Sequence, residues 1–322
     1  MSSTTDELKS PYHYIPSKWA GYLFTTLFGL STFAHIGVAL WRRMWFILPT
    51  VVLCGLFEVT GWAARLWSSY KPYEQTPYTM QISTTILAPT PFLAVVFILT
   101  GQVVSRLGSI YSRLSPRYYT RVFLSCDILS LLIQGAGGAL ASSGTGGPTL
   151  GSNIMLGGII FQTGELSLVS RVRPRTEVRV WPAVILVFAL FCLEYFIRYF
   201  KGRPIRSIGS SKTTATDTNR GEFTKKLGMM VLALAFITQV LFIRAIYRTI
   251  ELADGWTGRI ISTESYFLVL DAMMIVFAML TLNFIHPWTY VYETPPESIG
   301  LASTQKPSDD VLLTHLYPEA RV

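Results

Sequence analysis

The chain carries four acidic side chains inside stretches that are otherwise apolar: Glu58, Asp127, Glu194 and Asp271. An ionisable side chain at the centre of a bilayer costs on the order of 3 kcal/mol on insertion scales, so it normally faces a bundle interior or a water-filled path and has a partner. Glu194 has a local explanation, because Arg198 lies one turn further on and the two can reach the membrane surface together. The other three are candidates for holding a polar group within the membrane.

Arginines and further acids recur at helical spacing near one end of three apolar stretches. Glu58 and Arg65 share one helical face, and Glu264 begins the stretch that contains Asp271. We predict that these charges meet at one membrane level. They form either a buried ion-pair network that fixes helix register or a site for a zwitterionic or cationic lipid headgroup, because arginine can hold phosphate while the acids hold an amine. The predicted cluster is Glu58, Arg65, Arg244, Arg248, Glu251, Glu264 and Asp271.

A second polar face lies on the fourth apolar stretch. There Asp127, Ser130 and Gln134 share one helical face with Gly137, Gly138 and Ala141, at steps of three and four residues. This face is too polar to contact lipid. Small residues let helices approach closely and an amide can bond across them, so the face forms a close-packed helix interface, the lining of a translocation route, or both.

Two prolines, Pro89 and Pro91, fall within the third apolar stretch. Proline removes a backbone donor and frees a carbonyl, and neighbouring helices or water must satisfy the freed groups. The sequence therefore predicts a kink there, which is either static or a hinge beside the charged cluster.

Membrane-spanning helices must position all these residues. Half of the chain is hydrophobic and 14% is charged, so its apolar surface exceeds what one soluble core could hide. Since a spanning helix needs roughly 20 mostly apolar residues, the sequence predicts an all-α membrane protein with seven transmembrane helices, the fifth of them interrupted. The predicted spans are residues 19–40, 45–66, 82–105, 122–141, 151–163 with 180–199, 228–247 and 265–286.

The distribution of Lys and Arg predicts the orientation. One set of connecting loops carries twice as many basic residues as the other, and such loops stay in the cytoplasm. We therefore expect residues 1–17 to form an extracellular N-terminal segment, residues 18–287 to form the seven-helix domain, and residues 288–322 to form a disordered cytoplasmic tail.

Several motifs, in the right order, resemble those of a known family. They include FEVTGWAAR at residues 57–65, CDILSLLIQGAGG at 126–138, IRAIYRTIE at 243–251 and the pair His286 and Pro287. On these residues the chain resembles the fungal lipid-translocating exporter family, to which the aminocholesterol-resistance protein and the sphingoid long-chain-base exporter belong. The resemblance implies a fungal source, seven helices, an outside N-terminus and export of an amphiphilic lipid at a surface membrane.

We therefore expect a floppase-like exporter of amphiphilic lipids, such as sphingoid long-chain bases, that contributes to resistance to toxic amphiphiles. A seven-helix lipid sensor or receptor without transport activity is the alternative. We expect no enzymatic activity, cofactor, metal or nucleic-acid partner, and membrane lipids as the surroundings. The plasma membrane is the expected location, with a vacuolar or other endomembrane as the second choice, and the sequence leaves the oligomeric state open.

The fifth predicted span departs from the family pattern. In that pattern the position of Gln162 leads directly into an apolar run like the one that begins here at residue 180, whereas residues 164–179 intervene in this chain and carry four arginines and Pro174. Our hypothesis is that this insert comes from a retained intron or a gene-model error. A genuine re-entrant element is the alternative.

Deleting residues 164–179 tests this hypothesis. The deletion joins Thr163 to Val180 and creates one apolar run long enough to span the bilayer with tilt. We expect higher expression or higher thermal stability, measured on the purified protein in detergent. A lower yield of the deleted form would show instead that the basic insert is a native element with its own contacts.

Overall fold

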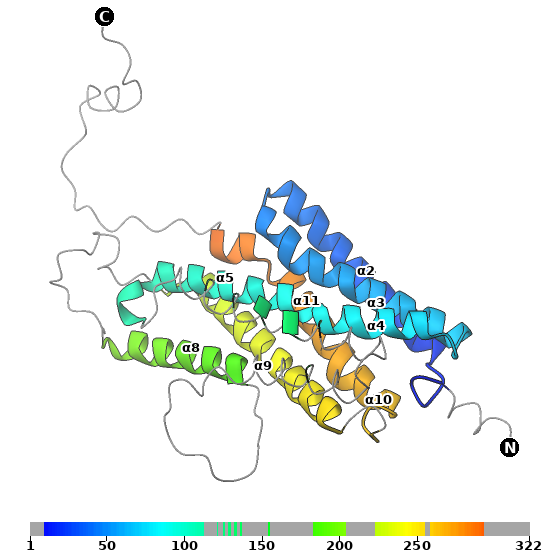
Figure 1. Ribbon diagram of the computed structural model, residues 1–322. Helices are drawn as coiled ribbons and strands as arrows, with labels where there is room; N and C mark the ends of the chain where they lie inside the picture. The colour runs from blue at the N-terminus through cyan, green and yellow to red at the C-terminus, as the bar shows by residue number, and fades with distance from the viewer. Residues whose placement is uncertain are drawn as a thin grey trace, which may run out of the picture.

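The computed structural model describes residues 10–112, 183–203, 223–254 and 258–292, together with isolated positions between residues 121 and 154. Within these residues the chain is all-helical and contains no strand (Figure 1). Asp127, Gln134 and the insert at residues 164–179 lie outside the described residues.

Five segments of the described chain are long and apolar enough to cross a membrane: Lys18–Trp41, Trp45–Tyr70, Gln75–Leu107, Lys225–Glu251 and Glu264–Phe284. They contain four of the predicted spans and most of a fifth, residues 265–286, which runs two residues past Phe284. The chain is therefore a multi-pass membrane protein. The predicted span at residues 180–199 overlaps helix α8 (Ala183–Lys201), while the total of seven spans and the orientation stay predictions.

The five segments are built from the following elements. The first is α2 (Lys18–Trp41), and the second joins η1 (Trp45–Ile47), η2 (Leu48–Val52) and α3 (Leu53–Tyr70). The third joins α4 (Gln75–Leu87) to α5 (Pro89–Leu107), which η3 (Ser109–Tyr111) follows. The fourth is α9 (Lys225–Asp254), and the fifth joins α10 (Glu264–Phe267), η6 (Leu268–Ala272) and α11 (Met273–Phe284), with the turn η7 (Trp288–Tyr292) after it.

Helix α3 is central to the packing at the end of the bundle that carries Arg65. It lies against α2 on one side and α4 on the other, and α9 packs along α11 (Figure 1). Gly61 of α3 permits the close contact with α4, because a Cβ atom at this position would lie 2.7 Å from both Thr84 Oγ1 and Thr85 Cγ2 of α4. Small residues are common at helix interfaces in membranes because they allow the backbones to approach closely. Moving an apolar side chain from lipid to protein contributes little free energy, so close packing is what stabilises the interface.

The third segment is broken at Ala88, between α4 and α5. Ala88 keeps helical torsion angles, but Pro89 cannot donate to the carbonyl of Thr85 four residues earlier, and Arg244 Nη2 donates to that carbonyl instead. The helix before this interruption begins at Gln75, seven residues before the predicted start of the span at residue 82, so the helix is longer than the predicted span. The earlier start brings a polar turn with Gln81 and Thr85 against α3 and α9.

Two further turns depart from regular α-helix. Asp271 lies in the π-helical turn η6, an irregularity that is frequent at functional sites. The turn η7 begins at Trp288, and its Val291 is buried against the core. Residues that pack against the bundle therefore follow residue 287, while the division into domains stays a prediction.

The α3–α4 contact gives a packing test. A Gly61→Ala substitution forces Thr84 or Thr85 to move, and we expect it to lower the free energy of unfolding by about 1–3 kcal/mol, the usual cost of overpacking. Thermal unfolding of the purified protein measures the change. Gly29→Ala is the matched control, because a Cβ at Gly29 meets nothing within 4 Å, and we expect that variant to be at least as stable as the original chain.

Candidate functional site

An ion pair between α3 and α10 lies at one end of the bundle. Arg65 Nη2 lies 2.9 Å from Glu264 Oε1. The same carboxylate accepts a hydrogen bond from the backbone N–H of Ser17 at 2.9 Å and another from the Ser17 hydroxyl. Glu264 therefore connects three segments that are far apart in the sequence.

The segment at residues 10–17 folds back over this pair. Tyr14 accepts a hydrogen bond from Arg65 Nη2 at 2.8 Å, and the Tyr12 hydroxyl lies 3.0 Å from Ser68 Oγ. Burial raises the pKa of Tyr12 to about 12, although the nearby Arg65 guanidinium opposes the shift, so the phenol stays neutral at physiological pH. Burial raises the pKa of Tyr14 as well. The sequence predicted that Arg65 lies near the membrane surface. In the structure the segment at residues 10–17 covers Arg65, and its side chain is only 1% exposed.

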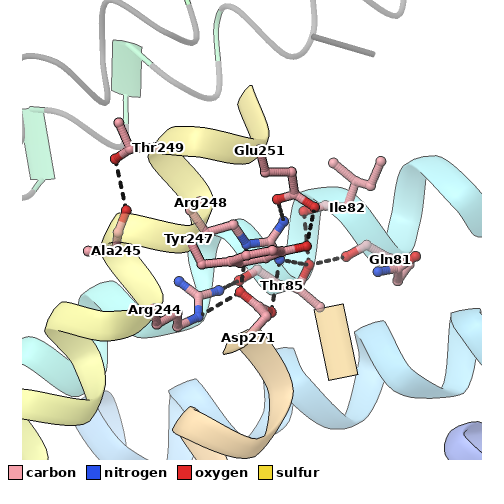
Figure 2. A network of polar contacts seen from close by, with 10 residues as sticks. All are labelled: Gln81, Ile82, Thr85, Arg244, Ala245, Tyr247, Arg248, Thr249, Glu251 and Asp271. Carbon is pink, nitrogen blue, oxygen red and sulfur yellow. Dashed lines mark hydrogen bonds and ion pairs between the residues drawn. The ribbon is translucent and has the colours of Figure 1, made fainter. Parts of the chain in front are cut away.

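A second cluster joins α9 to η6 at the same end (Figure 2). Arg248 binds Asp271 with two nitrogens, Nε to Oδ1 at 2.6 Å and Nη2 to Oδ2 at 2.9 Å. Its third nitrogen, Nη1, donates to Glu251 Oε2 at 2.8 Å, and Tyr247 donates to the other oxygen of Glu251 at 2.8 Å. A bidentate arginine–carboxylate pair is strong and directional, so it fixes the position of α9 relative to η6.

Arg244 extends the cluster one turn further along α9. Its Nε lies 3.0 Å from Asp271 Oδ1, but this contact lacks the alignment of a hydrogen bond. Its Nη2 donates to the backbone carbonyl of Thr85 on α4 at 2.8 Å. Asp271 thus faces two guanidinium groups, and α4 is tied to α9 through Arg244 (Figure 2).

The ring of Phe267 lies beside both arginine groups. The Arg65 guanidinium carbon is 4.8 Å from the ring centroid, and that of Arg248 is 5.1 Å away. Contacts of this kind stabilise a cation by up to about 2 kcal/mol when desolvated. The Arg65–Glu264 pair and the Arg248 cluster are therefore two parts of one site.

A small cavity of about 40 Å³ lies between these two parts. Its wall combines tyrosines, charged groups, one amide and aliphatic side chains: Tyr12, Tyr14, Arg65, Tyr78, Gln81, Ile82, Ile86, Arg248, Glu251, Ile261 and Phe267. Two buried polar atoms of wall residues, Arg65 Nε and Gln81 Oε1, make no hydrogen bond within the described chain. Buried polar atoms are normally paired, so these two atoms mark a region beside the cavity where the polar contacts are incomplete.

The remaining predicted residues lie at different places. Glu58 is fully buried on α3, and neither of its carboxyl oxygens has a hydrogen-bond partner in the described part of the chain. Glu194 pairs with Arg198 at 2.7 Å on α8, apart from the cavity, as the sequence predicted. Within the described residues, no group of three or more His, Cys, Asp or Glu side chains is placed to hold a metal ion.

Sequence reasoning missed the uncharged part of the site. Tyr12 and Tyr14 belong to a non-helical segment, where no periodicity marks them. Gln81 and Thr85 carried a usable signal, because they stand four residues apart on one helical face of a segment that joins an apolar run. That signal was lost when the predicted span began after Gln81.

Comparison with known families gives one match that covers most of the chain. A family model described as RTA1 like protein matches residues 51–171 and 180–294. The match is interrupted between residues 171 and 180, within the predicted insert.

Curated relatives come from Saccharomyces cerevisiae. The chain is 26% identical to the Sphingoid long-chain base transporter RSB1 of strain S288c over 85% of this chain and 72% of the relative. It is also 26% identical to Protein RTA1, over 89% of this chain and 88% of that protein. It is 27% identical to Protein RTM1, over 69% of this chain and 62% of that protein. No solved structure matches the chain.

The burial of Arg65 predicts a large cost for removing its charge. An Arg65→Gln substitution leaves Glu264 without its cation, and breaking a buried pair costs about 3–5 kcal/mol. We expect a clear fall in thermal stability in detergent. Lys71→Gln is the matched control, because Lys71 and Glu74 form a pair at 2.8 Å whose side chains are 60% and 40% exposed, and exposed pairs contribute about 0–1 kcal/mol. Equal losses in the two variants would contradict a structural role for the buried pair.

Proposed function

The chain belongs to the RTA1-like family, and we propose that it exports amphiphilic lipids with an amine headgroup, such as sphingoid long-chain bases. The proposal rests on family membership, on one relative that is named as a sphingoid long-chain base transporter, and above all on the cavity that both charged clusters border. We propose that this cavity receives the headgroup.

The size and chemistry of the cavity support a small polar headgroup. One buried water needs a cavity of about 10–15 Å³, so about 40 Å³ holds roughly three groups of that size. A sphingoid base carries one ammonium group and at least two hydroxyl groups. Glu251 and Gln81 supply acceptors for the ammonium, and Arg65 and the tyrosines supply donors for the hydroxyls.

The alkyl chain needs an apolar route beside the cavity. Ile82, Ile86 and Phe267 form the apolar part of the cavity wall. Around the bundle, large apolar side chains such as Phe33 and Phe284 are exposed, as expected for surfaces that contact lipid. We propose that the headgroup enters the cavity while the chain remains against lipid, so that only the polar part of the substrate needs protein contacts.

The proposed orientation places this cavity in the outer half of the membrane, beneath the N-terminal segment. Asp127, outside the described residues, would then offer a carboxylate in the cytoplasmic half, with Gln134 on the same helical face. Pro89 and Pro91 lie next to the break at Ala88, and we propose that this break is the hinge by which the α4 wall of the cavity moves. Export at the plasma membrane would lower the cellular load of toxic amphiphiles.

Lipid flux in proteoliposomes tests the proposal. We expect purified protein to accelerate the movement of a fluorescent sphingoid base between leaflets. Glu251→Gln keeps the side-chain shape but removes an acceptor charge from the cavity, and the lost charge-assisted contact should weaken substrate binding about tenfold or more.

Glu194→Gln is the matched control for that experiment. It removes an acidic charge from a membrane helix at a site apart from the cavity, and its flux should equal that of the unaltered protein. Specific binding of the base without any flux would support the lipid sensor instead of the exporter. Flux that is unchanged in a well-folded Glu251→Gln variant would contradict the cavity as the headgroup site.

A further inference from the structure

Glu58 stands apart from the other acids of the site. It lies on α3 seven residues before Arg65, is fully buried, and leaves both carboxyl oxygens without a hydrogen-bond partner among the described residues. The indole N–H of Trp62, one turn further along the helix, lies near this carboxyl group but without the alignment of a hydrogen bond. Glu251, Glu264 and Asp271, in contrast, each accept from an arginine. The ion pairs of the described residues do not include Glu58, so an ionised carboxylate there would be a buried charge without a paired cation, which proteins avoid.

The charges around Glu58 balance without it. The arginines Arg65, Arg244 and Arg248 face the three paired acids. The titratable and charged groups near Glu58 itself are Cys54 on α3, Arg244 and Arg248 on α9, and Asp271 on η6. An ionised Glu58 would therefore give this interior a net negative charge, whereas a protonated Glu58 leaves it neutral.

The other helices that pack on α3 supply no compensating charge. Helix α2 carries Lys18, which is exposed, and His35, which is held against the Met279 carbonyl of α11. Helix α4 contains Tyr78 but no Asp, Glu, Lys or Arg, and α5 contains one basic residue, Arg106, at its far end. The protonation of Glu58 therefore decides the charge of the whole cluster.

Arg244 is the group that can respond to this change. Of the three arginines, it is the one whose Nε approaches a carboxylate at 3.0 Å without hydrogen-bond alignment. If Glu58 is ionised, Arg244 can pair with it. Arg248 is then left with both Asp271 and Glu251, and the part of the cluster that borders the cavity gains one negative charge.

From this arrangement we infer that Glu58 is a proton-binding site whose proton is exchanged for the cationic headgroup of the substrate. The O–H bond of Glu58 breaks and its proton passes to water, while the ammonium enters the cavity beside Glu251. The ammonium then supplies the positive charge that the proton had supplied. One proton leaves for each amine that binds, so the net charge of the site is the same before and after. A proton gradient would then drive export. This inference rests on the proposed function, and it adds the energy source.

Proton release on binding provides the test. Purified protein in detergent, in a weakly buffered solution with a pH indicator, is titrated with a short-chain sphingoid base at about pH 5–7, where an alkyl amine keeps its proton. We expect about one proton released per base bound. Because proton and amine compete, affinity for the base should rise with pH, by up to about tenfold per pH unit.

Two variants and one control ligand test whether the released proton comes from Glu58. Glu58→Gln cannot ionise, so it should release no proton, bind the base more weakly and lose the pH dependence, whereas Glu194→Gln should behave like the unaltered protein. An N-acylated base, which has no charge, should release no proton from any of them. An infrared band of a protonated carboxyl group, present in the unaltered protein and absent from Glu58→Gln, reports the bound proton directly.

The possible failures are distinguishable. Binding of the base without proton release or pH dependence in the unaltered protein overturns the exchange and leaves the proposed export standing. An absence of base binding at every pH overturns the proposed function, and the exchange with it. If Glu58→Gln does not fold, the proton count of the unaltered protein decides the question by itself.

Discussion

Buried charge must be neutralised, and this requirement shapes the described end of the bundle. Charges attract strongly where water is excluded, and a charge without a partner is costly there. Arg65, Arg244 and Arg248 can be buried because acids from other segments reach them. The contact between Arg248 and Asp271 fixes α9 against η6, and the contact between Arg65 and Glu264 fixes α3 against α10. Helix register at this end therefore follows from charge pairing as well as from the fit of apolar surfaces.

The same pairing is compatible with the ligand site that we propose inside this apolar bundle. Each of these arginines faces an acid, and two buried polar atoms of residues beside the cavity, Arg65 Nε and Gln81 Oε1, have no hydrogen-bond partner within the described chain. Phe267 lies beside both guanidinium groups and keeps the two halves of the site at a fixed spacing. On our proposal, a headgroup would bind beside Glu251 while the contacts of Arg248 with Asp271 and Glu251 remain in place. This arrangement accommodates both interpretations of the cluster, as an ion-pair network and as a binding site, within one set of residues.

Much of the helical framework follows from local properties of the chain. Apolar length alone marks the five candidate spans, because a bilayer imposes a minimum length. The helical period of 3.6 residues places Glu58 and Arg65 on one face, and Arg244, Arg248 and Glu251 on another. Boundaries were predicted less well, because polar turns such as the one at Gln81 lower the local hydropathy even though the helix continues through them. The count of spans and their orientation depend on parts of the chain outside the described residues.

Composition and spacing were enough to predict a helical membrane protein and to locate the ionisable residues within its apolar segments. Which of those charges meet could be learned only from the packing of the helices. No local sequence pattern predicts the contact between Arg65 and Glu264, because 199 positions separate them. No pattern predicts either that Tyr14, in a non-helical segment, lies over Arg65. From the sequence alone, Glu58 and Asp271 are equivalent, since each is an acid inside an apolar stretch. In the structure Asp271 has two arginine partners, whereas Glu58 has no hydrogen-bond partner among the described residues. That difference arises from tertiary contacts, because a buried acid is paired only where another segment brings a cation within reach.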